Sequence, residues 1–259
     1  MKLRKKFLPG ILMAASLLLL IAILLCIETY RGRYTPYTGS HPTILAFARE
    51  HGLKPGDWPE DLVGLLDSSP EAEDFVLNYP LEHSKTHTID LSGLLDSESV
   101  PLLLQWDKRW GYARYGDGLI GQTGCGPTCL SMVCLYLLQD ASLDPGTLAE
   151  FSSRNGYCVP GNGTSWTLIS EGGKKLGLDI EEIPLVESII TKNLEAGNPI
   201  ICVMGPGDFT SSGHYIVLVG YENGLLRVND PNSPLRSQML WDFDDIQDQF
   251  RNLWVCKAP

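Results

Sequence analysis

Residues 123–138 read TGCGPTCLSMVCLYLL, a short glycine-rich opening followed by a long apolar run. The run from Thr128 to Leu138 is too long for a typical strand and rich in helix-forming residues, so we predict a buried helix there. Pro127 suits the first turn of that helix, because its missing amide hydrogen is one that the first turn leaves unpaired anyway. The stretch therefore predicts that Cys125 lies at the N-terminus of a core helix.

Working outward, helical patterns come first and strand patterns follow. Further helices are expected at Pro145–Arg154 and Ser165–Leu176. Strands are expected at Pro199–Met204, His214–Tyr221, Leu225–Asn229 and Leu253–Lys257, which are rich in Val, Ile, Leu and Tyr. This order predicts an α+β fold, with a helical lobe that carries Cys125 beside an antiparallel sheet, rather than a βαβ repeat.

The N-terminus has the pattern of a membrane anchor. Four cations within residues 2–6 precede an uncharged apolar run, residues 7–27, which is long enough to cross a bilayer as a helix. Residues 24–28 are large where a cleaved signal peptide needs small ones, so we expect an uncleaved signal-anchor. A lipoprotein at Cys26 is a minor alternative. The positive-inside rule predicts a single-pass protein of the cell membrane, extracytoplasmic after Arg33.

Three regions are predicted along the chain: the basic tip and anchor at 1–33, a tether and small helical appendage at 34–100, and the main domain at 101–259. The appendage is expected to contain short helices at Thr43–Glu50, Pro59–Leu66 and Pro70–Leu77. It is too small to be stable alone, so we expect it to pack on the main domain.

The charge distribution argues against a nucleic-acid partner. The chain carries 20 Lys and Arg against 31 Asp and Glu. Six of these cations and one of the acids precede residue 34, so the exported part carries an excess of acids. Such a surface repels a phosphate backbone, and no basic run interrupts it.

Seven cysteines occur, one of them in the apolar run. An even set of six in an exported part would ordinarily suggest disulfides. However, Cys125, Cys129 and Cys134 crowd into one predicted helix, and Cys202 lies in a predicted strand. Buried free thiols behave as small hydrophobes, so we expect at most one disulfide and assign Cys129 and Cys134 to the core.

Cys125 and His214 are candidates for nucleophilic chemistry. A helix N-terminus stabilises a thiolate, and the glycines on both sides of Cys125 would let a substrate backbone approach. The alternative is an ordinary buried thiol. His214 is the only histidine of residues 101–259 and begins a predicted strand after a polar loop, where it can serve as a general base. A solvated surface histidine is its alternative.

Three further residues are candidates for supporting roles. Asp230 ends the strand next to that of His214 and can fix the imidazole tautomer, although Asp-Pro is also a common turn. Asn229 faces the other side of the strand. Gln105 and Gln122 compete as donors of an oxyanion hole, together with the backbone N–H of the nucleophile. No cofactor is expected.

A zinc site is also considered. Cys125, Cys129 and His214 would leave a structural zinc site incomplete, so no metal is expected.

The ordered motifs also resemble a known family. They are Gln105-Trp106-Asp107, Gly124-Cys125-Gly126-Pro127-Thr128, Gly213-His214-Tyr215-Ile216-Val217 and Asn229-Asp230-Pro231. As a set, covering about residues 100–257, they are similar to the bacteriocin-processing cysteine peptidases and their relatives in bacterial envelopes. The resemblance implies a papain-like fold, a Cys125-His214-Asp230 triad and Gln105 as the oxyanion donor. Unlike bacteriocin processors, the chain has no ATP-binding loop or multi-span region, so leader cleavage coupled to export is not expected.

Together these features predict a membrane-anchored, extracytoplasmic thiol protease that hydrolyses peptide amide bonds through an acyl-enzyme, with a peptide or protein as substrate. An acyl transferase or a cell-wall peptide amidase on the same triad is the closest alternative. A catalytically silent peptide-binding module is the alternative from another class.

Overall fold

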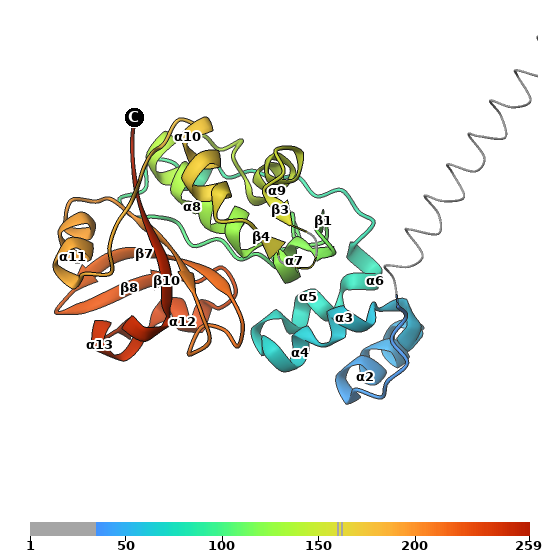
Figure 1. Cartoon of the computed structure of the whole chain (residues 1–259). Helices are drawn as coiled ribbons and strands as arrows, with labels where there is room; N and C mark the ends of the chain where they lie inside the picture. The colour runs from blue at the N-terminus through green and yellow to red at the C-terminus, as the bar shows by residue number, and fades with distance from the viewer. Residues whose placement is uncertain (1–34, 160, 162) are drawn as a thin grey trace, which may run out of the picture. The chain divides into compact units, whose positions relative to one another are not determined.

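The computed structural model describes residues 35–259, except 160 and 162 (Figure 1). The chain divides into two compact units, the first ending at Gly64 and the second formed by Leu65–Pro259. The predicted membrane helix, residues 7–27, lies outside the described residues. Among those that are described, no helix has the length and apolar character needed to cross a membrane.

The described part of the first unit is helical. It contains α2 (Pro42–His51), a 3-10 turn at Pro55–Asp57 and α3 (Glu60–Val63). Helix α2 begins with proline in its first turn and ends at Gly52, whose φ of 67° suits glycine. Phe47 of α2 packs edge-on against Trp58, with 6.1 Å between the ring centroids. The predicted helix at Thr43–Glu50 is thus confirmed.

The second unit begins with short helices that precede the main domain predicted from the sequence. They are α4 (Leu65–Ser68), a 3-10 turn at Pro70–Ala72, α5 (Glu73–Leu77), α6 (Tyr79–Glu82) and a 3-10 turn at Ser92–Leu94. Phe75 stacks on Tyr112 at 4.3 Å, and the Tyr112 hydroxyl donates to the Phe75 carbonyl. Residues 65–100 therefore pack within the unit that holds Cys125, while the predicted domain boundary at residue 100 stays a prediction.

A helical lobe follows. Its elements are β1 (Arg114–Tyr115), β2 (Gly118–Leu119), α7 (Ile120–Thr123), α8 (Cys125–Leu138), α9 (Pro145–Arg154), β3 (Cys158–Val159), β4 (Gly163–Thr164), a π-helical turn at Leu168–Gly172 and α10 (Gly173–Lys175). Helix α8 is buried from Gly126 to Leu135, as the apolar run predicted. Helix α9 has the predicted bounds. The helix predicted at 165–176 is confirmed over residues 168–175, where the π-helical stretch continues directly into α10.

The C-terminal part forms a six-stranded antiparallel sheet in the order β5-β10-β6-β7-β8-β9. Its elements are β5 (Asp179–Glu182), α11 (Glu187–Glu195), β6 (Ile200–Met204), β7 (His214–Glu222), β8 (Leu225–Asn229), α12 (Pro234–Gln238), β9 (Leu240–Trp241), α13 (Phe243–Ile246), a 3-10 turn at Gln247–Gln249 and β10 (Phe250–Lys257). The α+β prediction and its four strands are confirmed. The sequence analysis missed the outer strands β5 and β9.

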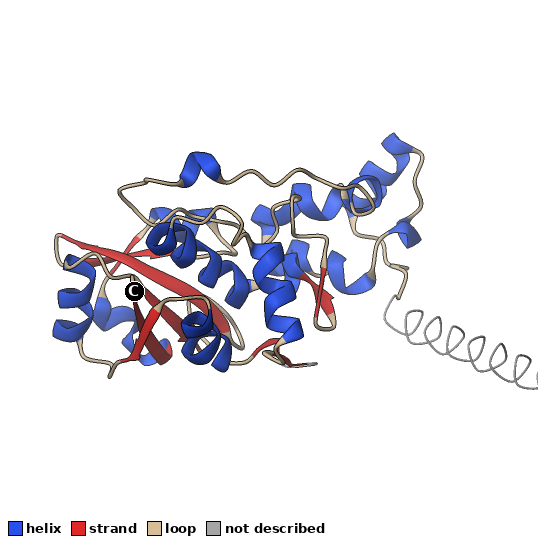
Figure 2. Cartoon of the chain, turned by 90° about the horizontal axis from the view of Figure 1, so that it is seen from above, coloured by secondary structure: helices blue, strands red, loops and turns tan. Residues whose placement is uncertain are grey.

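The sheet separates two apolar cores, because alternate residues of a strand face opposite sides. On one side, Val203 and Val217 join the core built around α8. On the other, Cys202 and Ile216 join a second core with Ile190 of α11. Figure 1 shows α7–α10 grouped on one side of β7 and β8, and Figure 2, turned by 90°, shows the long strands gathered together with helices around them. This packing brings the N-terminus of α8 close to the start of β7.

Candidate active site

Cys125 is the first residue of α8, directly after the N-cap Gly124, as predicted. Its thiol is half-buried and borders a cleft. Cys129, one turn further, is completely buried, and its burial raises the pKa of its thiol well above the ordinary value. Only the first of these two neighbouring thiols is therefore placed to react with a molecule in the cleft.

The glycines beside Cys125 have a packing role that the sequence analysis did not foresee. A Cβ on Gly126 would lie 2.6 Å from Thr164 Cγ2, and a Cβ on Gly124 would lie 2.6 Å from the Ile120 carbonyl oxygen. Both distances are too short for real contacts. The glycines therefore allow β4 and α7 to pack against the start of α8, and the space at Gly126 is filled by the protein itself.

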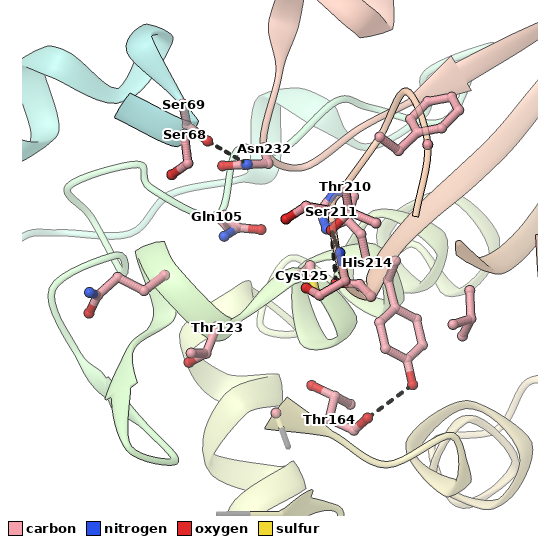
Figure 3. A pocket seen from close by; sticks show the side chains of 18 of the residues that line it. Ser68, Ser69, Gln105, Thr123, Cys125, Thr164, Thr210, Ser211, His214 and Asn232 are labelled. Atoms are coloured by element: carbon pink, nitrogen blue, oxygen red, sulfur yellow. Dashed lines mark hydrogen bonds between the residues drawn. The ribbon is translucent and has the colours of Figure 1, made fainter. Parts of the chain in front are cut away.

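His214 begins β7 and lies beside Cys125 at the cleft (Figure 3), close enough for Cys125 to raise the His214 pKa. Its Nε2 atom lies 2.7 Å from Asp230 Oδ1. Asp230 directly follows β8, the neighbour of β7 in the sheet, and is fully buried. Asn229 is turned to another partner, since its Nδ2 donates to the Val100 carbonyl at 3.0 Å. The structure thus brings Cys125, His214 and Asp230 together.

The two candidate glutamines differ in what their amides do. Gln105 is buried, and its Nε2 donates to the Gly121 carbonyl at 3.0 Å, while no described group bonds its Oε1. Gln122 is half-buried, and its Oε1 accepts the Leu119 backbone N–H at 3.0 Å at the start of α7. Both residues border the cleft. The side chain of Gln122 is thus committed to starting a helix.

A family model described as the Peptidase_C39 like family matches residues 97–256. The chain belongs to this family. The matched region begins after α4–α6, runs through the nucleophile helix α8 and ends within β10. All four predicted site residues lie inside it.

Two solved structures are similar to the chain. One is the peptidase domain of Streptococcus ComA, a bifunctional ABC transporter involved in a quorum sensing pathway. It shows 20% identity and a TM-score of 0.44, covering 62% of this chain and 99% of that one. The other is a putative C39-like peptidase from Bacillus anthracis. It shows 15% identity and a TM-score of 0.41, covering 67% of this chain and 98% of that one. A comparison with curated proteins found no match.

The charges at this C39-like site stabilise one another. Burial alone would lower the pKa of His214, but the Asp230 carboxylate outweighs burial and Cys125 adds to its effect, so the His214 pKa lies above its ordinary value. Burial alone would raise the pKa of Asp230. His214 and Arg236 outweigh it, so the Asp230 pKa lies below its ordinary value. Both shifts favour an imidazolium beside an ionised carboxylate.

Arg236 is the site residue that the sequence analysis missed. It lies on α12, and its Nε donates to Asp230 Oδ2 at 2.5 Å, opposite the oxygen that bonds His214. The Asn232 backbone N–H also donates to Oδ1, at 2.8 Å. A lone arginine six residues after Asp230 gives no signal in a single sequence. The contact depends on how the intervening loop folds back.

The cleft at Cys125 has a volume of about 1160 Å³ and a wall rich in hydroxyl groups and glycines (Figure 3). The hydroxyl-bearing residues are Ser68, Ser69, Thr123, Thr164, Ser165, Thr210, Ser211, Ser212 and Tyr215. Trp166 adds an apolar surface that is 47% exposed. The charged side chains at the cleft are bonded within the protein, Asp208 to Gln249 and Arg236 to Asp230.

The described residues contain no group of three or more His, Cys, Asp or Glu side chains arranged to hold a metal ion. The six cysteines within the described ranges are all free thiols.

Proposed function

We propose that the chain is a cysteine peptidase that hydrolyses peptide amide bonds with Cys125, His214 and Asp230. The observation that carries the proposal is that Cys125 and His214 lie side by side at the cleft, while the His214 ring lies 2.7 Å from the buried Asp230 carboxylate. Asp230 holds Nε2 of the ring, which leaves Nδ1 for the thiol. This is the arrangement that a nucleophile, a base and an orienting carboxylate require.

In the proposed reaction, His214 takes the Cys125 proton and the thiolate attacks the substrate carbonyl carbon. The amide C–N bond then breaks, and His214 returns the proton to the leaving amine. Water attacks the resulting thioester, releases the acid product and restores the thiol. The backbone N–H of Cys125 at the start of α8 and the Gln105 amide are the proposed donors to the oxyanion. Gln105 is preferred over Gln122 because it lies in the Gln-Trp-Asp segment of the family resemblance, and its Nε2 has a second hydrogen beside the one donated to Gly121.

The test is cleavage of a peptide library by the full-length protein in detergent, with products identified by mass spectrometry. We expect discrete cleavage products from wild type and none from Cys125→Ala. Cys158→Ala is the matched control, because Cys158 is also a half-buried free thiol, and it should keep wild-type turnover. Loss of activity in both cysteine variants, each well folded, would contradict the assignment.

The same assay separates the alternatives. Products joined to an added amine instead of water would identify an acyl transferase, and cleavage confined to cell-wall peptides would identify an amidase. A protein that retains bound peptides without cutting them, and whose Cys125 reacts with alkylating agents no faster than Cys158, would be a peptide-binding module.

We further propose that residues 7–27 anchor the protein in the cell membrane, with the basic N-terminal tip in the cytoplasm and the chain after Arg33 outside it. The support is the cluster of cations before an uncharged apolar run of membrane-spanning length. The protein should stay in the membrane pellet after alkaline extraction, and its N-terminal peptide should be present in the mature form. A mature N-terminus near residue 30 would refute the anchor.

A further inference from the structure

The loop that carries Asp230 is held by residues that precede the family-matched region. Asn232 Nδ2 donates to Ser69 Oγ at 2.7 Å, a contact between side chains 163 residues apart (Figure 3). The Ser233 hydroxyl donates to Glu71 Oε2 at 2.5 Å. The Leu235 backbone N–H donates to Glu71 Oε1 at 2.9 Å. The Glu71 carboxylate thus accepts hydrogen bonds from both the N-cap residue of α12 and its first turn.

Helix α12 carries Arg236 to the Asp230 carboxylate and is held by two further hydrogen bonds. Ser233 Oγ accepts the Arg236 backbone N–H at 3.0 Å, which caps the helix. The Asp230 backbone N–H donates to Ser237 Oγ at 2.8 Å. The helix has only five residues, and short helices are marginal alone, so its place depends on these bonds and on Glu71.

The Asp230 carboxylate is fully buried, with His214 on one oxygen and Arg236 on the other. During turnover the imidazole gives its proton to the leaving amine, and a carboxylate facing only a neutral ring would then lack a counter-charge. A buried unpaired charge is costly. Arg236 keeps a cation on the carboxylate whatever the state of His214.

We propose that Arg236 is a positioning residue of the active site, and that Ser69 and Glu71 form a clamp that holds α12 and the 230–233 loop in place. The proposal rests on the proposed function, since it concerns how Asp230 is held for His214. It makes a segment outside the family-matched region a part of the catalytic apparatus. It also explains why α4–α6 pack within the same unit as the cleft.

Few titratable groups affect the pKa values of His214 and Asp230. Those that act on Asp230 are His214 and Arg236, and those that act on His214 are Asp230 and Cys125. The Asp230 charge also raises the pKa of the buried Cys129 thiol, although burial is the larger cause. Loss of Arg236 removes a cation that lowers the Asp230 pKa. The carboxylate then takes up a proton at higher pH and no longer supports an imidazolium beside the thiol.

The experiment measures the alkylation of Cys125 by iodoacetamide against pH, in the full-length protein, by mass spectrometry of the Cys125 peptide. This readout needs no substrate, so it also decides the proposal if peptide cleavage is never found. Arg236→Gln should move the acid limb of the alkylation profile upward by about half a pH unit or more, which is about a threefold loss of rate at a pH on that limb. Arg236→Lys keeps the cation and should restore most of the wild-type profile.

Turnover provides the second readout. Arg236→Gln should lower kcat by about 10- to 100-fold, the effect of losing one charge-assisted hydrogen bond at the site, with a smaller change in KM. Glu71→Ala should move the alkylation profile in the same direction as Arg236→Gln. If Glu71→Ala does not fold, Glu71→Gln, which keeps one acceptor oxygen, should show a smaller shift of the same sign.

The controls are an exposed arginine and an exposed glutamate nearby. Arg227→Gln removes a cation that pairs with Glu222 on the surface of the same sheet, and Glu73→Ala removes an exposed acid two residues beyond Glu71. Neither should move the profile. A wild-type profile in Arg236→Gln, with only a lower melting temperature, would make Arg236 merely structural and overturn the proposal. A shift in Arg236→Gln but none in the Glu71 variants would overturn the clamp.

Absence of peptide cleavage by wild type, with Cys125 no more reactive than Cys158, would instead count against the proposed function. The role of Arg236 would still be decided by comparing the acid limb of the Cys125 alkylation profile in the Arg236 variants with that of wild type.

Discussion

Asp230→Asn tests the central contact of the site, because it changes the charge of a buried group and keeps its shape. If the amide oxygen takes the place of Oδ1, it still accepts from His214 Nε2 and from the Asn232 N–H. The new NH₂ group then faces the Arg236 Nε–H, and because both groups are donors, no hydrogen bond can form between them. The substitution therefore removes a charge-assisted hydrogen bond without creating a cavity.

The magnitude follows from these contacts. A hydrogen bond to a charged group contributes about 1.5–3 kcal/mol, and the bonds that remain weaken because their acceptor loses its charge. We expect Asp230→Asn to lower the free energy of unfolding by about 2–4 kcal/mol near neutral pH. For a chain of this size that is a fall in melting temperature of about 5–15 °C.

The pH dependence has a definite sign. The folded-state pKa of Asp230 is lowered, so its stabilisation is present above the unfolded value of about 4 and is lost as the pH falls through the folded-state pKa. The folded-state pKa of His214 is raised, so its stabilisation is full below about pH 6.5 and is lost as the pH rises through the folded-state pKa. The pair therefore contributes most between about pH 4 and 6.5.

The assay is thermal unfolding of wild type and Asp230→Asn at a series of pH values from acid to neutral. The difference in melting temperature should be largest in that window and shrink toward zero in strong acid, where wild-type Asp230 is also neutral. Asp140→Asn is the matched control, since Asp140 is an exposed carboxylate whose pKa is lowered by Ser142. A difference for Asp230→Asn that stays constant through the acid range would refute the argument.

The remaining predictions concern the other site residues and the early helices. Cys129→Ser should cost about 1–3 kcal/mol of stability by burying an unpartnered hydroxyl, measured by thermal unfolding, and spare the turnover that Cys125→Ala abolishes. Gln105→Ala should lower kcat and kcat/KM together by about 10²-fold, whereas Gln122→Ala should act on melting temperature through the start of α7. Phe75→Ala should destabilise the second unit by about 3–5 kcal/mol, measured by thermal unfolding.

Local patterns predicted the elements that depend on local chemistry. The apolar run after Pro127 predicted α8, and short runs rich in Val, Ile, Leu and Tyr predicted β6–β8 with nearly correct bounds. These elements lie in the two cores, where the hydrophobic pattern and the burial agree. The same patterns led to Cys125 and His214, because each begins a strongly patterned element.

Elements at the edge of the fold escaped prediction. Strand β5 is Asp179-Ile180-Glu181-Glu182, in which Ile180 is buried and the acids are exposed. Such a sequence has low intrinsic preference for a strand, and only its pairing with β10 makes it one. The helix predicted at 165–176 does form over residues 168–175, but its π-helical winding at Leu168–Gly172 was not predicted.

The supporting contacts of the site could not be predicted because they are long-range. Glu71 and Ser233 are 162 residues apart in the chain. They meet through one carboxylate and one hydroxyl group, and such groups are common in any surface loop. Arg236 looks like an ordinary basic residue until α12 folds back on Asp230. Polar groups give a single sequence no periodic pattern, so only the three-dimensional structure shows which of them are buried together.

The loop after Asp230 also connects the two halves of the proposed chemistry. Its Pro231 carbonyl accepts the Gln105 backbone N–H at 2.8 Å, and its Asn232 carbonyl accepts Trp106 Nε1 at 3.2 Å. A displacement of this loop would therefore move the proposed oxyanion donor as well as the carboxylate that orients His214. Residues that act through one shared loop have non-additive effects when they are changed together. The order of the 230–233 loop is thus a common requirement for proton transfer and for oxyanion binding.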